Sequence, residues 1–100
     1  MGKIEKSLSG IEIIQELGQR YAHLRKRAKL TQKDIAKQSG ISVFTISGFE
    51  NGTQTGISMA SFIKLMRALD EVDPLDSLLP EVYESPSETY FRLSKKTKKK

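Results

Sequence analysis

Side chains that commonly carry catalysis or hold metals are sparse in this sequence and are not grouped. His23 is the single histidine, and there is no cysteine, so a conventional zinc site and a disulfide are both excluded. Serine, histidine and aspartate are nowhere spaced as a nucleophile with its base, and no glycine-rich stretch carries the lysine of a phosphate-binding loop. We therefore expect no enzymatic activity, no cofactor and no metal.

Positive charge is concentrated in parts of the sequence. The formal net charge is +5, and five lysines stand within residues 95–100. Residues 20–37 carry seven lysines and arginines against one acid, Asp34, whereas residues 70–88 carry seven acids and no lysine or arginine. A cationic segment of this density binds polyanions, and an acidic one is repelled by them. The face that carries the cationic segment should contact phosphate groups, and the face that carries the acidic segment should point away from them.

Short helices are predicted around the cationic segment. Thr31, Ser42 and Ser58 each follow one apolar residue and precede another by four positions, a pattern typical of a helix cap with a hydrophobic staple. Helices are therefore expected to begin at about these three residues. Gly40 and Asn51-Gly52 suit the left-handed backbone that ends a helix. The second and third helices should thus be short and joined by a tight turn.

Longer apolar patterns complete an all-α fold of five helices. Residues Ile14 to Ala28 carry apolar side chains in steps of three and four, which predicts an amphipathic first helix. The same spacing predicts a fourth helix whose core face includes Met59 and Met66. Asp73-Pro74 is interpreted as the cap and first residue of a short fifth helix. No segment alternates with the period of a strand.

The chain divides into three parts by composition. Residues 1–12 form a lead segment, 13–80 a helical domain, and 81–100 a flexible tail that is acidic and then lysine-rich. Aromatic residues in this tail anchor a partner or pack loosely on the domain, and the sequence leaves both open. Neither a membrane-spanning run nor a secretory signal is present, so a cytoplasmic location is expected.

The two short helices have the residues that a helix-turn-helix requires. Ala36 is small where the helices touch, Gly40 permits the turn, and Ile46 fills the gap between them. This geometry projects the start of the second short helix outward. It can then enter the major groove of DNA while the first crosses the backbone.

The run LTQKDIAKQSGISVFTISGFENG, residues 30–52, resembles the helix-turn-helix of the XRE family of Cro and phage repressors. The resemblance extends over about Glu16 to Pro80 and implies a lambda-repressor-like domain that binds double-stranded operator DNA as a homodimer and represses transcription. It implies that a set of residues of the third helix reads base edges: Ser42, Val43, Phe44, Thr45, Ser47 and Gly48.

The resemblance also implies contacts away from the bases. Arg25 and Glu50 match a pair that forms an internal salt bridge in relatives. Gln32 matches a residue that bonds a DNA phosphate at a helix start. Together with cations expected near the groove, the predicted backbone contacts are Arg20, Gln32, Lys33, Lys37, Asn51, Thr53 and Gln54.

One departure from the family pattern bears on specificity. Relatives often read bases with glutamine, asparagine or arginine, and residues 42–49 contain none of these. Hydroxyl groups bond either type of base, while Val43 or Phe44 could touch a thymine methyl group. Phe44 could instead belong to the core, which would leave Val43 as the reader. Specificity could also rest on DNA shape or on the lysine-rich tail.

A second resemblance concerns protein partners. The stretch ISMASFIKLMRALDEVDPLDSLLPE, residues 57–81, is similar to a bacterial subgroup of HipB-like antitoxins, encoded beside kinase toxins of the HipA type. It implies an autoregulating antitoxin that also binds a toxin. The alternative hypothesis is a protein-interaction module for a toxin or polymerase, with DNA binding secondary.

Overall fold

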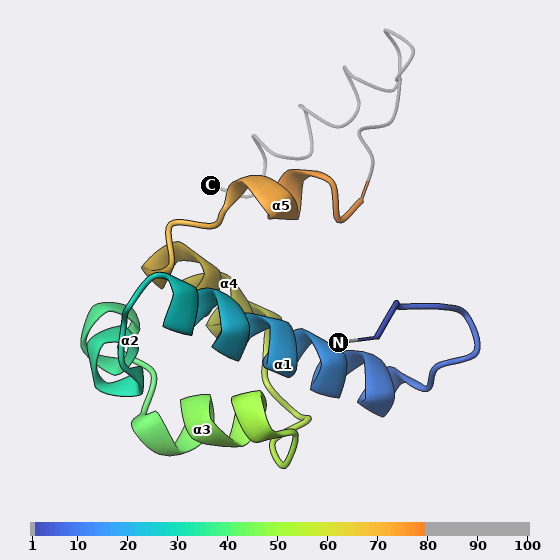
Figure 1. Cartoon of the computed structure of the whole chain (residues 1–100), viewed down its shortest axis with the longest axis horizontal. Coiled ribbons are helices and arrows are strands. Elements are labelled where there is room, and N and C mark those ends of the chain that lie inside the picture. The colour runs from blue at the N-terminus through green and yellow to red at the C-terminus, as the bar shows by residue number, and fades with distance from the viewer. Residues whose placement is uncertain (1, 80–100) are drawn as a thin grey trace, which may run out of the picture.

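The computed structural model describes residues 2–79 of the chain. Within this range the fold is entirely helical, and no strand is present (Figure 1). The all-α class predicted from the sequence is confirmed, whereas the predicted tail, residues 81–100, lies outside the described residues. The helices are α1 (Gly10–Arg27), α2 (Gln32–Ser39), α3 (Val43–Asn51), α4 (Met59–Ala68) and α5 (Asp73–Asp76).

Hydroxyl caps begin four of the five helices. Thr31, Ser42 and Ser58 each accept a hydrogen bond from the backbone N–H three residues on, so the predicted starts of α2, α3 and α4 are confirmed. Ser9 and Glu12 form a reciprocal capping box that begins α1 at Gly10, inside the segment assigned to the lead. In α5 the cap is a different residue, Val72, so Asp73 is the first helical residue and not the cap as predicted.

A residue with left-handed backbone stands at or just after the end of four of the helices. Gly40 ends α2 with a φ of 75°, and Gly52 ends α3 with a φ of 86°, as the sequence predicts. After α1 and α4 the same conformation falls on residues with side chains, Lys29 at φ 60° and Asp70 at φ 58°. A side chain in this conformation costs about 1 kcal/mol relative to glycine. The cost at Lys29 is relevant to the site described below.

The core is built from one or two residues of each of the first four helices. Tyr21, Ile35, Ile46, Phe49 and Leu65 are almost completely buried. The Tyr21 hydroxyl donates to the Leu65 carbonyl oxygen at 2.7 Å, which ties α1 to α4, and burial raises the pKa of this phenol above its ordinary range. The ring of Phe49 on α3 packs on Tyr21 of α1 and on Phe62 of α4, so aromatic contacts help to fix α3 against both helices.

The two methionines of α4 differ in burial. Met66 is 8% exposed and belongs to the core as predicted. Met59 is 61% exposed, so its assignment to the core was wrong. Met59 is the first residue of α4 and follows the Ser58 cap. Its spacing places it on the apolar face of the helix, but a residue at the end of a helix can extend beyond the part that is packed against the core.

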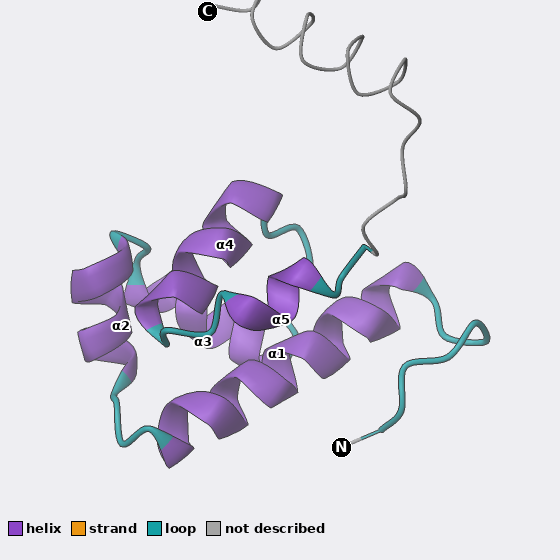
Figure 2. Cartoon of the chain, turned by 90° about the horizontal axis from the view of Figure 1, so that it is seen from above, coloured by secondary structure: helices purple, strands orange, loops and turns teal. Residues whose placement is uncertain are grey.

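The acidic helix α5 and the helix α3 lie on opposite sides of the described domain. α1 runs through the middle, with α3 on one side of it and α5 on the other (Figure 1), and the view from above shows α5 in front of α1 and α3 (Figure 2). Asp73 and Asp76 of α5 are exposed. No helix of the described part has the length and apolar character needed to cross a membrane.

Candidate nucleic-acid interface

α3 presents a free face at its start. Ile46 and Phe49 are buried, and since successive helix residues turn by about 100°, Phe44 projects from nearly the opposite side. The Phe44 side chain is 76% exposed and Val43 is 40% exposed. Phe44 is therefore not a core residue, and the alternative left open by the sequence is settled by its exposure. Ser47, one turn after Phe44, is half-buried on the same side.

The hydroxyl groups of this segment are partly engaged in local structure. Ser42 Oγ accepts from the backbone N–H of Thr45 at 3.1 Å and lies 3.0 Å from Thr45 Oγ1. Capping of α3 therefore uses Ser42, and its predicted contact with a base would compete with that cap. The hydroxyls of Thr45 and Ser47, both half-buried, have no such capping role.

Gly48 differs from the other residues predicted to read bases. It is buried, and a Cβ at this position would overlap the side chain of Gln54, which packs across it. The Gly48 carbonyl oxygen also accepts from the backbone N–H groups of Thr53 and Gln54, both at 2.9 Å. Gly48 therefore lets the loop after α3 pack closely on the helix, and the structure does not present it to a ligand.

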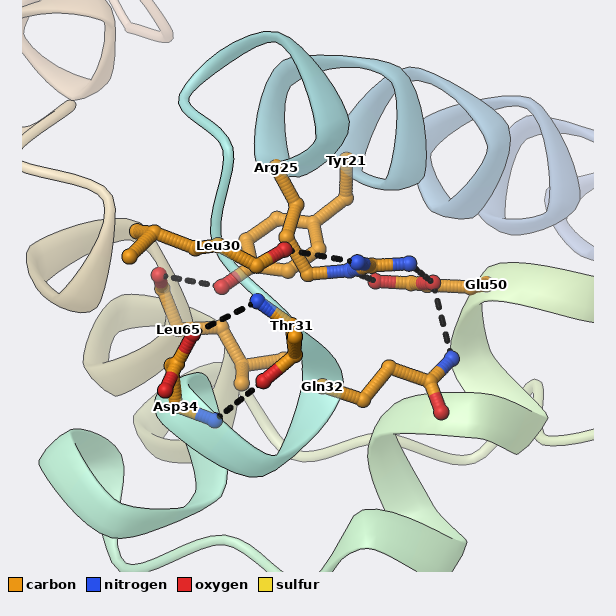
Figure 3. Close-up of polar contacts among 8 residues, drawn as sticks. All are labelled: Tyr21, Arg25, Leu30, Thr31, Gln32, Asp34, Glu50 and Leu65. Atoms are coloured by element: carbon orange, nitrogen blue, oxygen red, sulfur yellow. Dashed lines mark hydrogen bonds and ion pairs between the residues drawn. The ribbon is translucent and has the colours of Figure 1, made fainter.

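Arg25 and Glu50 form a buried ion pair between α1 and α3 (Figure 3). Arg25 donates from Nε to Glu50 Oε2 at 2.7 Å and from Nη2 to Oε1 at 2.8 Å, a two-bond fork. The hydrogen bonds to Glu50 raise the pKa of Arg25 above its ordinary value. The structure thus brings together the two residues that the resemblance pairs.

The ion pair also holds the start of α2. Arg25 Nη1 donates to the Leu30 carbonyl oxygen at 2.8 Å, and Gln32 Nε2 donates to Glu50 Oε1 at 3.0 Å. Figure 3 shows Gln32 reaching across from α2 to Glu50 on α3. One carboxylate therefore fixes the end of α1, the start of α2 and the end of α3 relative to one another.

A cation-lined groove lies beside the hydrogen-bond network of Arg25, Gln32 and Glu50. It has a volume of about 830 Å³ and is bordered by the end of α1, the start of α2 and the first residue of α3, Val43. Four of its lining residues are cationic: Arg25, Lys26, Lys29 and Lys33. Lys26 and Lys29 belong to the cationic segment 20–37 but are not among the individually predicted backbone contacts, because the sequence does not show which surface a lysine at a helix end or in a turn faces. The groove can hold an anion next to the exposed start of α3.

The remaining predicted backbone contacts are spread around the groove and α3. Lys37 is exposed one turn after Lys33 on α2. Asn51 and Thr53 are exposed beyond the end of α3, where Thr53 donates to Asn51 Oδ1 through both its hydroxyl and its backbone N–H. Gln54 lies over Gly48. These four contacts stay predictions.

Arg20 is placed apart from the groove. Its guanidinium pairs with Glu16 one turn earlier on α1, Nε to Oε2 at 2.9 Å, and donates from Nη2 to the Gly2 carbonyl oxygen at 2.8 Å. Gly18, only two residues earlier, faces α3, so Arg20 points to another side of α1. The DNA contact of Arg20 stays a prediction. Its pairing with Glu16 and Gly2, away from the groove, does not favour it.

A short helix that follows a left-handed turn and exposes its first residues beside a cation-lined groove is the arrangement of a DNA-binding helix-turn-helix domain. A helix-turn-helix (HTH_3) family model matches residues 22–76, more than half of the chain. The chain belongs to this family of XRE and Cro-type regulators and is a DNA-binding helix-turn-helix regulator. No curated protein matches it.

Proposed function

We propose that this protein is a sequence-specific repressor in which α3 enters the major groove and the cation-lined groove grips the adjoining phosphates. The observation that carries the proposal is the contiguity of the two surfaces, since Val43 both begins α3 and lines the groove with Lys29 and Lys33. The exposed start of α3 would face base edges. The start of α2, where Gln32 lies, would point its free N–H groups at a phosphate.

The test is selection of duplexes from a randomised pool, followed by binding titrations of the selected duplex over a range of salt concentrations. Lys33→Ala should weaken binding to all duplexes and reduce the slope of log affinity against log salt by about one. Lys64→Ala removes an exposed cation of α4 outside the groove and is the matched control, with no expected change. If the salt dependence of the Lys33→Ala variant equals that of the wild type, the groove does not contact the DNA backbone as proposed.

Lys29→Gly should separate stability from DNA binding. The substitution relieves the left-handed strain and is expected to raise the free energy of unfolding by about 1 kcal/mol. It also removes one cation of the groove, so affinity for the selected duplex should fall and the salt slope should decrease by about one. Urea unfolding and DNA titration measure the two effects. A variant that gains stability and keeps full affinity would show that Lys29 does not contact DNA.

We also propose that the repressor is a homodimer, with two copies of α3 spaced by about 34–36 Å in successive major grooves. Exposed apolar side chains on either side of α5, Val72 before it and Leu78 and Leu79 after it, support a contact with another chain. Light scattering should report twice the chain mass of 11.3 kDa. A monomer on DNA would contradict this.

A HipA-type kinase toxin is the proposed second partner, on the strength of the HipB-like resemblance of residues 57–81. The acidic α5 on the side away from α3 supports a protein surface separate from the DNA face. The test is co-purification with the protein encoded next to this one, with and without residues 85–100. Both activities would be cytoplasmic. Failure of co-purification would leave only the DNA-binding role.

A further inference from the structure

We infer that Phe44 selects operators by contacting the C5 methyl groups of thymines in the major groove. The inference rests on the proposed function, because it assigns base discrimination to one side chain of the helix placed in that groove. It names a specificity determinant that acts through an apolar contact rather than through a hydrogen bond.

The position of Phe44 carries the argument. It is the second residue of α3, and 76% of it is exposed although a phenylalanine side chain is large and apolar. Since successive helix residues turn by about 100°, it lies on the side of α3 opposite Ile46 and Phe49, the two residues of this helix that belong to the core. An apolar side chain at the leading turn of a recognition helix meets the groove floor, where thymine alone among the four bases presents a methyl group.

The neighbouring residues offer little competing readout. Val43 is a second apolar group, 40% exposed and adjacent to Phe44. Ser42 is engaged as the cap of α3, and Gly48 is covered by Gln54. The described face of α3 from 43 to 50 presents no amide or guanidinium group that could bond an adenine or guanine edge in the usual bidentate way. Among residues 43–50, contact with a thymine methyl group is therefore the strongest base discrimination available.

The experiment compares a selected duplex with copies in which individual thymines are replaced by deoxyuridine, which removes only the methyl group. For wild-type protein, one or two such replacements per half-site should weaken binding about fourfold each. Phe44→Ala should bind the thymine duplex several-fold more weakly and should lose the difference between thymine and deoxyuridine at those positions. The side chain is exposed, so the variant should keep the wild-type unfolding midpoint.

Met59→Ala is the matched control, because Met59 is also a large exposed apolar residue in the first turn of a helix. It should retain the full sensitivity to deoxyuridine. Equal wild-type affinity for every thymine and deoxyuridine duplex would overturn the inference while leaving the proposed function intact. A Phe44→Ala loss that is the same on both duplexes would also overturn it, since the ring would then contact DNA without sensing the methyl group. Failure to select any sequence would overturn the proposed function as well.

Discussion

Replacing Glu50 with alanine is expected to lower the free energy of unfolding by about 3–5 kcal/mol, because it leaves the Arg25 charge buried without its partner. The two side chains are only 6% and 9% exposed, and the carboxylate accepts three hydrogen bonds. A small domain has a total stability of about 5–15 kcal/mol, so the variant should unfold at much lower urea. Urea denaturation followed by circular dichroism measures the change.

The matched control is Glu16→Ala, which breaks the ion pair with Arg20. There the arginine side chain is 42% exposed, so solvent screens the charge that remains and the loss of stability should be far smaller than for Glu50→Ala. Equal losses for Glu50→Ala and Glu16→Ala would contradict the argument from burial. Replacing Arg25 and Glu50 together with methionine and leucine should recover much of the loss, because no unpaired charge is then left inside.

Gly18→Ala is expected to destabilise the protein by about 3 kcal/mol, the upper part of the range for overpacking. A Cβ on Gly18 would overlap the carbonyl oxygen of Phe49 and lie 2.9 Å from its carbonyl carbon. Both are backbone atoms, so no side chain can rotate away, and α1 must separate from α3. The expected loss outweighs the gain of about 1 kcal/mol that alanine gives in a helix interior. Thermal or urea unfolding would measure it.

Gly10→Ala is the control for this prediction. Gly10 lies at the start of the same helix, and a Cβ there would meet no atom within 4 Å. It should leave stability unchanged or raise it by up to about 1 kcal/mol. Gly18→Ala should also weaken DNA binding, because the displaced α3 would no longer align with the groove. A Gly18→Ala protein as stable as wild type would mean that the helices do not approach this closely.

The features that the sequence predicted are those that depend on interactions between close neighbours. The hydroxyl caps at Thr31, Ser42 and Ser58 bond groups three residues away, and the left-handed Gly40 and Gly52 reflect a backbone preference of a single residue. Such signals are visible in a few consecutive letters. The cap that begins α1 is equally local, a serine followed by glutamate three residues later, and that signal was available at the start of the chain.

The features that the sequence did not predict depend on packing between distant segments. Gly18 is needed only because the Phe49 backbone passes against it, and Gly48 only because Gln54 folds over it. Lys29 occupies a conformation usually taken by glycine, and no local pattern marks a lysine for it. Burial of Arg25 and Glu50 likewise arises from tertiary contact, so only the family resemblance indicated their pairing.

The placement of every core contact on one side of α3 has a consequence for how such a regulator can change its targets. The side that holds Ile46 and Phe49 fixes the helix in the domain, while Val43 and Phe44 are not part of the core. Substitutions at the outer positions are therefore free of the folding penalty that would accompany changes on the inner side. Duplicated copies of this chain could diverge toward new binding sequences while keeping the same scaffold.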